Sequence, residues 1–174
     1  MGGTGEALSY SEVDGGSNRF ARLLRSRGVT TGGHVAFLME NNIRYLELAW
    51  GAQRSGLYYT ALNNHLRPSE VQYILDDCGA TALVTTPAMA EVVSRLDLGQ
   101  IPIRLVVGGP LRGFDDYETS AQPFESTPVD DESEGREMLY SSGTTGKPKG
   151  VRKTLPATPL GDPSACLLYT SRCV

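Results

Sequence analysis

Cysteine, histidine and tryptophan are scarce in this chain of 174 residues. It contains three cysteines, two histidines and one tryptophan. An odd number of cysteines without paired spacing predicts neither a disulfide framework nor a zinc site. Cys78 falls on the apolar face of an expected helix, which favours a thiol in the core. A catalytic thiol would need a histidine partner, and no spacing connects Cys78 to His34 or His65. We expect structural or solvated roles for both histidines.

The sequence also lacks long apolar runs and any excess of positive charge. No run approaches the ~20 residues that a membrane span needs, and the first residues lack the basic and apolar segments of a signal peptide. The formal net charge of −4 argues against broad nucleic-acid binding, which needs a concentrated basic patch. Apolar residues make up 40% of the chain, as in ordinary globular proteins. We therefore expect a cytoplasmic domain with one hydrophobic core.

Helical and extended patterns alternate along most of the chain. Ser11 is the expected cap of a helix that runs to about Arg27. Further helices are expected from about 43 to 54, with Leu46, Ala49 and Trp50 at the spacing of one apolar face, from Pro68 to Cys78, and from Pro87. The expected strands are apolar throughout, as in sheets buried on both faces; they lie at 34–39, 58–62, 81–85, 104–107 and 137–141. This alternation predicts an α/β fold with a mostly parallel sheet and flanking helices.

Residues 114–135 break this pattern. The segment contains eight acidic residues and two prolines, and its spacing matches no calcium-binding loop. We expect a solvated connection with at most one helical turn.

A string rich in glycine, hydroxyl and lysine residues then occupies positions 140–150, directly after an expected strand. Glycines permit positive φ and close approach to a bulky anion, and backbone N–H groups in such turns bind phosphate. A Walker A loop does not fit, because only two residues separate Gly143 from Gly146 and a proline follows Lys147. The string predicts a polyphosphate site whose candidate residues are Ser141, Ser142, Gly143, Thr144, Thr145, Gly146, Lys147, Lys149 and Gly150.

Positions 139–151 resemble the signature loop of the adenylate-forming superfamily, which includes acyl-CoA synthetases, luciferases and the adenylation domains of peptide synthetases. Segments 49–60 and 73–80 resemble its bacterial fatty acyl-CoA synthetase branch. The resemblance implies an enzyme that uses ATP and Mg²⁺ to convert a carboxylic acid to an acyl-adenylate, from which coenzyme A displaces AMP. It also implies that 141–146 hold the β- and γ-phosphates and that Lys149 adds positive charge, with a weaker role for Lys147.

The resemblance extends over roughly 8–163, and the family's ribose motif and catalytic lysine, which lie further downstream, have no counterpart here. We therefore expect residues 1–165 to be an incomplete N-terminal subdomain of the adenylate-forming fold, inactive alone, with apolar surface and strand edges exposed. Met1 is expected to be an internal methionine, and 166–174 a tail translated from adaptor DNA. No catalytic residue is assigned. Two alternatives stay open: a non-catalytic nucleotide-binding module, and a fragment of an aryl- or amino-acid-activating adenylate-former.

Overall fold

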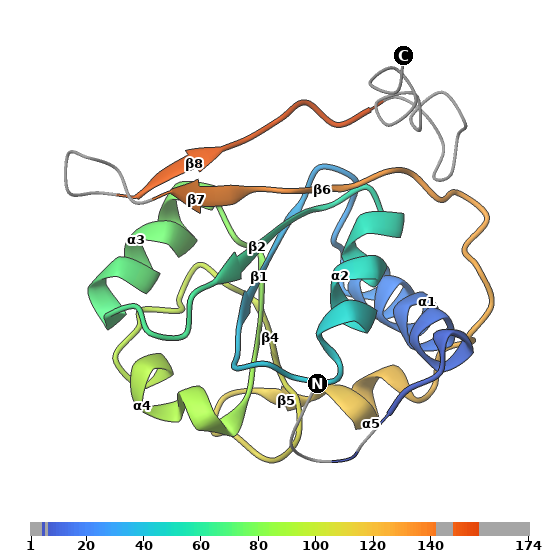
Figure 1. Cartoon of the computed structure of the whole chain (residues 1–174), viewed down its shortest axis with the longest axis horizontal. Helices are drawn as coiled ribbons and strands as arrows, with labels where there is room; N and C mark the ends of the chain where they lie inside the picture. The colour runs from blue at the N-terminus through green and yellow to red at the C-terminus, as the bar shows by residue number, and fades with distance from the viewer. Residues whose placement is uncertain (1–4, 6, 142–147, 157–174) are drawn as a thin grey trace.

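A parallel β-sheet forms the centre of the computed structural model, which describes residues 5, 7–141 and 148–156 (Figure 1). Its strand order is β5-β4-β3-β1-β2-β6, and each neighbouring pair is parallel. The strands are β1 (His34–Leu38), β2 (Tyr58–Leu62), β3 (Ala82–Thr85), β4 (Ile103–Val106), β5 (Asp115–Asp116) and β6 (Arg136–Glu137). The predicted α/β fold with a mostly parallel sheet is confirmed.

Helices cover both faces of the sheet. One face is packed by α1 (Tyr10–Ser26), α2 (Tyr45–Arg54) and α5 (Tyr117–Ala121), and the other by α3 (Pro68–Cys78), the 3₁₀ turn Pro87–Met89 and α4 (Ala90–Val93) (Figure 1). Successive residues of a strand point to opposite faces. Val35 and Phe37 accordingly join the apolar cluster under α1 and α2, whereas Ala36 and Leu38 join the cluster under α3. Every residue of β1 is buried, as the unbroken apolar run predicted.

The apolar stripe predicted for α3 is confirmed, because Val71, Ile74, Leu75 and Cys78 are all buried. Burial raises the pKa of the Cys78 thiol to about 12, which fits the expected core thiol. Pro68 occupies the first turn of the helix, and Gly79 ends it with φ 64°.

The face predicted for α2 is partly wrong. Ala49 is buried and Trp50 half-buried, but Leu46 is 51% exposed and Leu48 is buried instead. The cause is the crossing with α1, where a side chain at Gly51 would place its Cβ 2.8 Å from a backbone carbonyl oxygen of α1. This close approach turns the glycine side of α2 toward α1, so that tertiary packing overrides the spacing of apolar residues.

The N-cap of α1 is Ser9, not the predicted Ser11. The Ser9 hydroxyl accepts a hydrogen bond from the Glu12 amide (3.2 Å), and the Glu12 carboxylate accepts one from the Ser9 amide (2.7 Å). This capping box needs a glutamate three residues after the cap, and only Ser9 has one at that spacing.

Substituting Ser9 with alanine should therefore lower the free energy of unfolding by about 1 kcal/mol, because an N–H of the first turn loses its acceptor. Ser11→Ala, in an exposed position two residues further on, is the matched control and should change stability little. Chemical denaturation of both variants measures the difference. A larger loss for Ser11→Ala would return the cap to the position that the sequence predicted.

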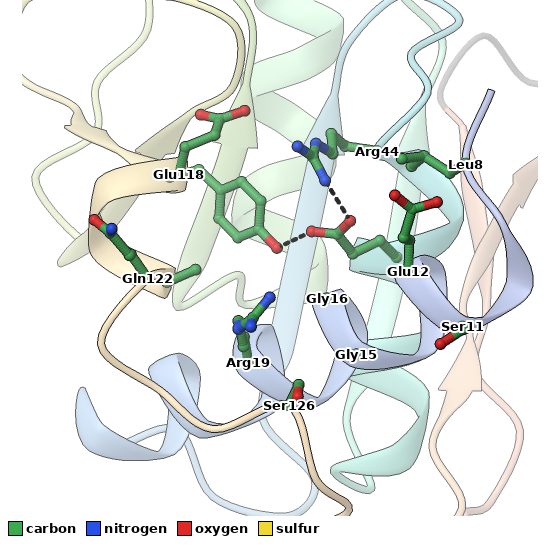
Figure 2. Close-up of a pocket in the computed structure, with 13 residues that line it drawn as sticks. Leu8, Ser11, Glu12, Gly15, Gly16, Arg19, Arg44, Glu118, Gln122 and Ser126 are labelled. Atoms are coloured by element: carbon green, nitrogen blue, oxygen red, sulfur yellow. Dashed lines mark hydrogen bonds and ion pairs between the residues drawn. The ribbon is translucent and has the colours of Figure 1, made fainter. Parts of the chain in front are cut away.

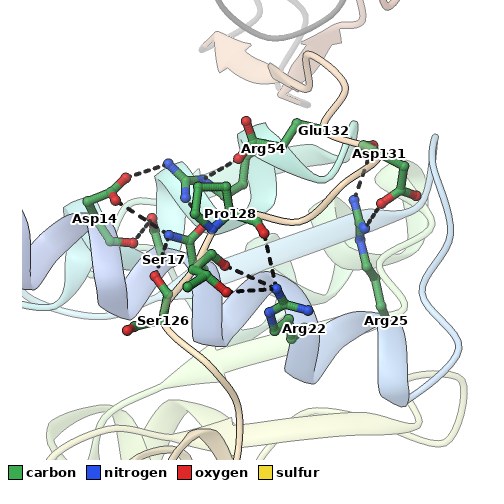
Figure 3. Close-up of polar contacts among 11 residues, drawn as sticks. Asp14, Ser17, Arg22, Arg25, Arg54, Ser126, Pro128, Asp131 and Glu132 are labelled. Carbon is green, nitrogen blue, oxygen red and sulfur yellow. Dashed lines mark hydrogen bonds and ion pairs between the residues drawn. The ribbon is translucent and has the colours of Figure 1, made fainter.

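The acidic segment is largely exposed and contains one short helix, as predicted, but it is also bound to α1, which the sequence did not indicate. It forms the edge strand β5 and the helix α5, and 122–134 then cross α1 as an extended strap (Figure 3). Arg19 donates to the Phe124 carbonyl (3.2 Å), Arg22 donates to the carbonyls of Thr127 and Pro128, and Arg25 pairs with Asp131. The missed signal is the spacing of these arginines, which places them three residues apart on one face of α1.

A second tie to the strap comes from Arg54 at the end of α2. Arg54 is 8% exposed. Its guanidinium donates to Asp14 of α1 (2.7 Å) and to Asn18, and lies 3.5 Å from the Glu132 carboxylate of the strap (Figure 3). Asn18 also donates to the Ser126 carbonyl (2.8 Å). One buried cation thus joins α1, α2 and the strap.

Fewer large apolar side chains are exposed among the described residues than an incomplete subdomain was expected to show. The large apolar side chains exposed there are Tyr10, Leu46, Leu139 and Val151. The outer strands of the main sheet, β5 and β6, have two residues each, and three of those four residues are acidic and one basic. Short, charged edge strands discourage pairing with other chains.

Candidate functional site

The chain leaves the main sheet from β6, which pairs with the first two residues of β2 and runs in the same direction, toward the carboxyl ends of the strands. β6 runs parallel to β2, and beyond it the Met138 amide donates to the Tyr59 carbonyl (2.8 Å). The next residues form β7 (Leu139–Ser141), which pairs antiparallel with β8 (Lys149–Val151). In open α/β sheets, ligands bind beyond the carboxyl ends of the strands. The loop that joins β7 to β8 begins on that side of the sheet.

The two faces of the β7–β8 ribbon differ. Leu139 pairs with Val151, and Ser141 pairs with Lys149, so these four alternate positions share one face. All four are exposed. The ribbon thus presents a hydroxyl and an ammonium group opposite each other, at the positions where the strands meet the loop.

The other face, formed by Tyr140 and Gly150, turns toward α3. The Tyr140 hydroxyl donates to the Asp77 carboxylate (2.6 Å), and burial together with this carboxylate raises the pKa of the phenol. A Cβ at Gly150 would lie 2.4 Å from the Met138 side chain and 2.8 Å from the Tyr140 ring. Gly150 does not have positive φ. Glycine is therefore required at position 150 because a Cβ has no room beside Met138 and the Tyr140 ring. The positive φ expected from the sequence is not the reason.

The predicted phosphate-loop residues fall into two groups. Ser141, Lys149 and Gly150 lie on the ribbon, and the structure brings the first two opposite each other. The remaining six predicted residues lie outside the described part of the chain: Ser142, Gly143, Thr144, Thr145, Gly146 and Lys147.

His34 is buried behind the ribbon at the start of β1, which agrees with its expected structural role. Its Nε2 atom lies 2.8 Å from the Thr60 hydroxyl, which in turn donates to the Met138 carbonyl (2.9 Å). Burial, and secondarily the Arg152 guanidinium, lower the pKa of the imidazole to about 4. No local pattern predicts this link to the ribbon, because its three residues are far apart along the chain. His65 is exposed and lies outside it.

Acid should destabilise the fold through His34. Its pKa is about 4 in the folded chain and 6.5 when unperturbed, so the unfolded state binds the extra proton between those values. The contribution of neutral His34 to the free energy of unfolding is fully present above pH 6.5. It falls as the pH is lowered toward 4, by up to about 1.4 kcal/mol per pH unit. Denaturation midpoints from pH 4 to 7 should show this slope, and His34→Gln should reduce it. An equal slope in both proteins would assign the acid sensitivity to other groups.

A cavity of about 550 Å³ lies on the opposite side of the fold, between α1 and α5 (Figure 2). Arg44 reaches into it and pairs with the buried Glu47 carboxylate (2.9 Å), which also accepts a hydrogen bond from Tyr117. A Cβ at Gly16 would lie 2.3 Å from that carboxylate, so the glycine makes room for it. Every polar atom of Glu47 has a partner, which is typical of a structural ion pair.

A second cavity, of about 600 Å³, lies beyond the carboxyl ends of β1 and β2, lined by Met39, Asn42, Tyr45, Asn63 and His65 among others. Within the described ranges, no cluster of three or more His, Cys, Asp or Glu could hold a metal ion. No helix among the described residues is long and apolar enough to cross a membrane.

Known proteins resemble this chain over most of its length. The family described as AMP-binding enzyme matches residues 1–157. Feruloyl-CoA synthase of an Amycolatopsis species is 36% identical over 150 residues, covering 86% of this chain and 29% of the relative. The long-chain-fatty-acid–CoA ligase FadD13 of Mycobacterium tuberculosis is 29% identical, with 84% and 29% covered. The chain thus spans less than a third of the length of these relatives.

The fold comparison agrees. The crystal structure of the anthranilate CoA ligase AuaEII in complex with anthranoyl-AMP has a TM-score of 0.75 and 27% identity, over 84% of this chain and 29% of that protein. The N-terminal domain of FACL13 from Mycobacterium tuberculosis has a TM-score of 0.68 and 27% identity, over 83% and 36%. With the family match covering most of its residues, this chain belongs to the AMP-binding enzyme family, as its resemblance to adenylate-forming acyl-CoA synthetases predicted.

Proposed function

We propose that this chain is the phosphate-binding part of an ATP-dependent, AMP-forming acid–CoA ligase. The observation that supports this most directly is the β7–β8 ribbon, where Ser141 and Lys149 lie opposite each other on an exposed face. In the proposed enzyme, 141–146 and Lys149 bind the β- and γ-phosphates of ATP. The rest of the active site, and the activity, belong to a longer protein of which this chain is a segment.

The chemistry required of this region is electrostatic. Attack of a carboxylate on the α-phosphate gives the acyl-adenylate and releases pyrophosphate, and the negative charge of pyrophosphate grows in the transition state. Fixed N–H, hydroxyl and ammonium groups stabilise such charge most effectively when they are positioned in advance. Magnesium would accompany ATP, because Mg²⁺ commonly binds through substrate phosphates. The proposed location is the cytoplasm, where ATP and coenzyme A are available as substrates.

The proposed acid has a large apolar group. The segments at 49–60 and 73–80 suggested a fatty acid, and FadD13 supports that class at 29% identity. Feruloyl-CoA synthase, at 36%, supports an aryl acid instead. Both classes share a carboxylate attached to an apolar body, and we propose this shared chemistry for the substrate.

ATP–pyrophosphate exchange tests the proposal in the longer protein. Exchange should depend on a carboxylic acid, and a panel of fatty and aryl acids should identify the class. The chain of 174 residues should show no exchange, and ATP with Mg²⁺ should not raise its melting temperature. Stabilisation of the short chain by ATP would instead support the non-catalytic nucleotide-binding module. Absence of acid-dependent exchange in the longer protein would overturn the ligase proposal.

A further inference from the structure

Two hydroxyl groups of β2 connect the β7–β8 ribbon to the main sheet. The Thr60 hydroxyl donates to the carbonyl of Met138, directly before β7 (2.9 Å). The Tyr58 hydroxyl donates to the carbonyl of Lys153, two residues after β8 (2.8 Å). Each strand of the ribbon therefore has one such connection, close to the end that lies away from the loop. Because Tyr58 and Thr60 are two residues apart on one strand, both point to the same face of β2.

One imidazole contacts both of these side chains. His34 lies opposite Tyr58 in the parallel register, and the two rings stack with centroids 6.1 Å apart at an interplanar angle of 18°. Its Nε2 atom lies 2.8 Å from the Thr60 hydroxyl. His34 is 3% exposed, Tyr58 is 5% exposed and Thr60 is 1% exposed. All three side chains are therefore buried, and their relative positions are fixed by the register of β1 and β2 rather than by a loop.

The hydrogen-bond directions determine which tautomer His34 adopts. The Thr60 hydroxyl has one hydrogen, and it is directed to the Met138 carbonyl. Thr60 must therefore accept from His34, which places the imidazole proton on Nε2. The Nδ1 atom is then the unprotonated nitrogen, and it is buried without a partner among the described residues. A neutral imidazole fits this site, whereas a proton on Nδ1 would have no acceptor there.

We infer that His34, Thr60 and Tyr58 form a positioning unit that fixes both strands of the β7–β8 ribbon, and with them the placement of Ser141 and Lys149. The three side chains act through the carbonyls of Met138 and Lys153. The effect on ATP rests on the proposed function, whereas the effect on the ribbon does not.

The groups around His34 make this unit sensitive to acid. From β2 it faces the hydroxyls of Tyr58 and Thr60; the Thr81 hydroxyl donates to its backbone carbonyl (3.2 Å). The cation close to it is Arg152, whose guanidinium carbon lies 4.2 Å from the centroid of the Tyr58 ring. Protonating the imidazole adds a second positive charge beside Arg152. The ribbon should therefore loosen on acidification before the sheet unfolds.

Hydrogen exchange of the ribbon amides in the full 174-residue chain tests the inference. Thr60→Val and Tyr58→Phe each remove one hydroxyl while keeping the shape, and each should speed ribbon exchange by about five- to tenfold. Thr85→Val is the matched control, because the buried Thr85 hydroxyl likewise donates to a carbonyl, that of Leu38 (2.7 Å), but away from the ribbon. It should leave ribbon exchange unchanged. His34→Gln keeps an N–H donor and should preserve slow exchange at lower pH than the wild type.

The outcomes separate the positioning unit from the proposed reaction. Equal ribbon exchange in Thr60→Val, Tyr58→Phe and wild type would overturn the inference, as would equal acceleration by Thr85→Val. In the longer ligase, Thr60→Val should raise KM for ATP in pyrophosphate exchange about tenfold at a smaller cost in kcat. Thr60→Val and Tyr58→Phe could speed hydrogen exchange of the ribbon while the longer protein shows no ATP–pyrophosphate exchange in any variant. That result would support the positioning unit and overturn the ligase proposal.

Discussion

Replacing Gly135 with alanine should detach the β7–β8 ribbon from the sheet. An added Cβ would lie 2.3 Å from the Leu57 carbonyl oxygen, 2.7 Å from the Leu57 nitrogen and 2.9 Å from the Gln53 carbonyl oxygen. All three are backbone atoms, from the last turn of α2 and from the residue before β2, so no side chain can move aside. The bonds from Gly135 to Gln53 (2.6 Å) and from Arg136 to Leu57 (3.0 Å) would have to break. We expect a loss of about 3 kcal/mol or more, at the upper end of single-residue effects.

Chemical denaturation and ribbon hydrogen exchange measure this loss. Gly99→Ala is a matched control, because Gly99 lies in an exposed loop without positive φ and meets only the end of the Asp97 side chain, at 3.2 Å. It should change stability by about 0.5 kcal/mol at most. If Gly135→Ala unfolds at the same midpoint as the control, the packing of β6 against β2 is not as close as described.

Lys149→Ala in the proposed full ligase should slow ATP–pyrophosphate exchange by about a hundred- to a thousandfold, the usual effect of removing one charge-stabilising group from a transition state. Lys149 is exposed on the same face of the ribbon as Ser141, so its loss opens no cavity in the core. If the ammonium acts mainly in the transition state, kcat and kcat/KM should fall together.

Lys153→Ala provides the control for charge. Lys153 is also an exposed lysine near the ribbon, but only its backbone carbonyl has a described role, as the acceptor from Tyr58. Exchange rates should stay close to wild type in this variant. Equal rates in Lys149→Ala and wild type would remove Lys149 from the proposed site, and equal losses in both lysine variants would indicate a general effect of positive charge.

The parallel sheet and the buried face of α3 could be predicted because local signals and tertiary packing agree there. Apolar runs without alternation predict strands buried on both faces, and β1 is buried at every position. In α3, Pro68, the apolar stripe and Gly79 all indicate the same helix. The face of α2 was misjudged because Gly51, which has no side chain to count, allows the close crossing with α1.

The strap and the positioning unit depend on contacts between distant residues, which local patterns do not reveal. The composition of the strap is typical of a solvated acidic linker, and only the structure shows that Arg22 and Arg25 of α1 bind it. His34 and Thr60 are 26 positions apart, and Thr60 and Met138 are 78 apart. By contrast, the phosphate-loop candidates form one contiguous string, which is why they could be named from the sequence before the fold was known.

The strap also has a consequence for the order of folding. It carries the chain from β5 at one edge of the sheet to β6 at the other, across the surface of α1. Neither the strap nor β6 has a binding surface until α1, α2 and β2 have assembled, and contacts between distant residues form slowly. We expect the ribbon to dock last, so that a nascent chain places Ser141 and Lys149 opposite each other only after the rest of the domain has folded.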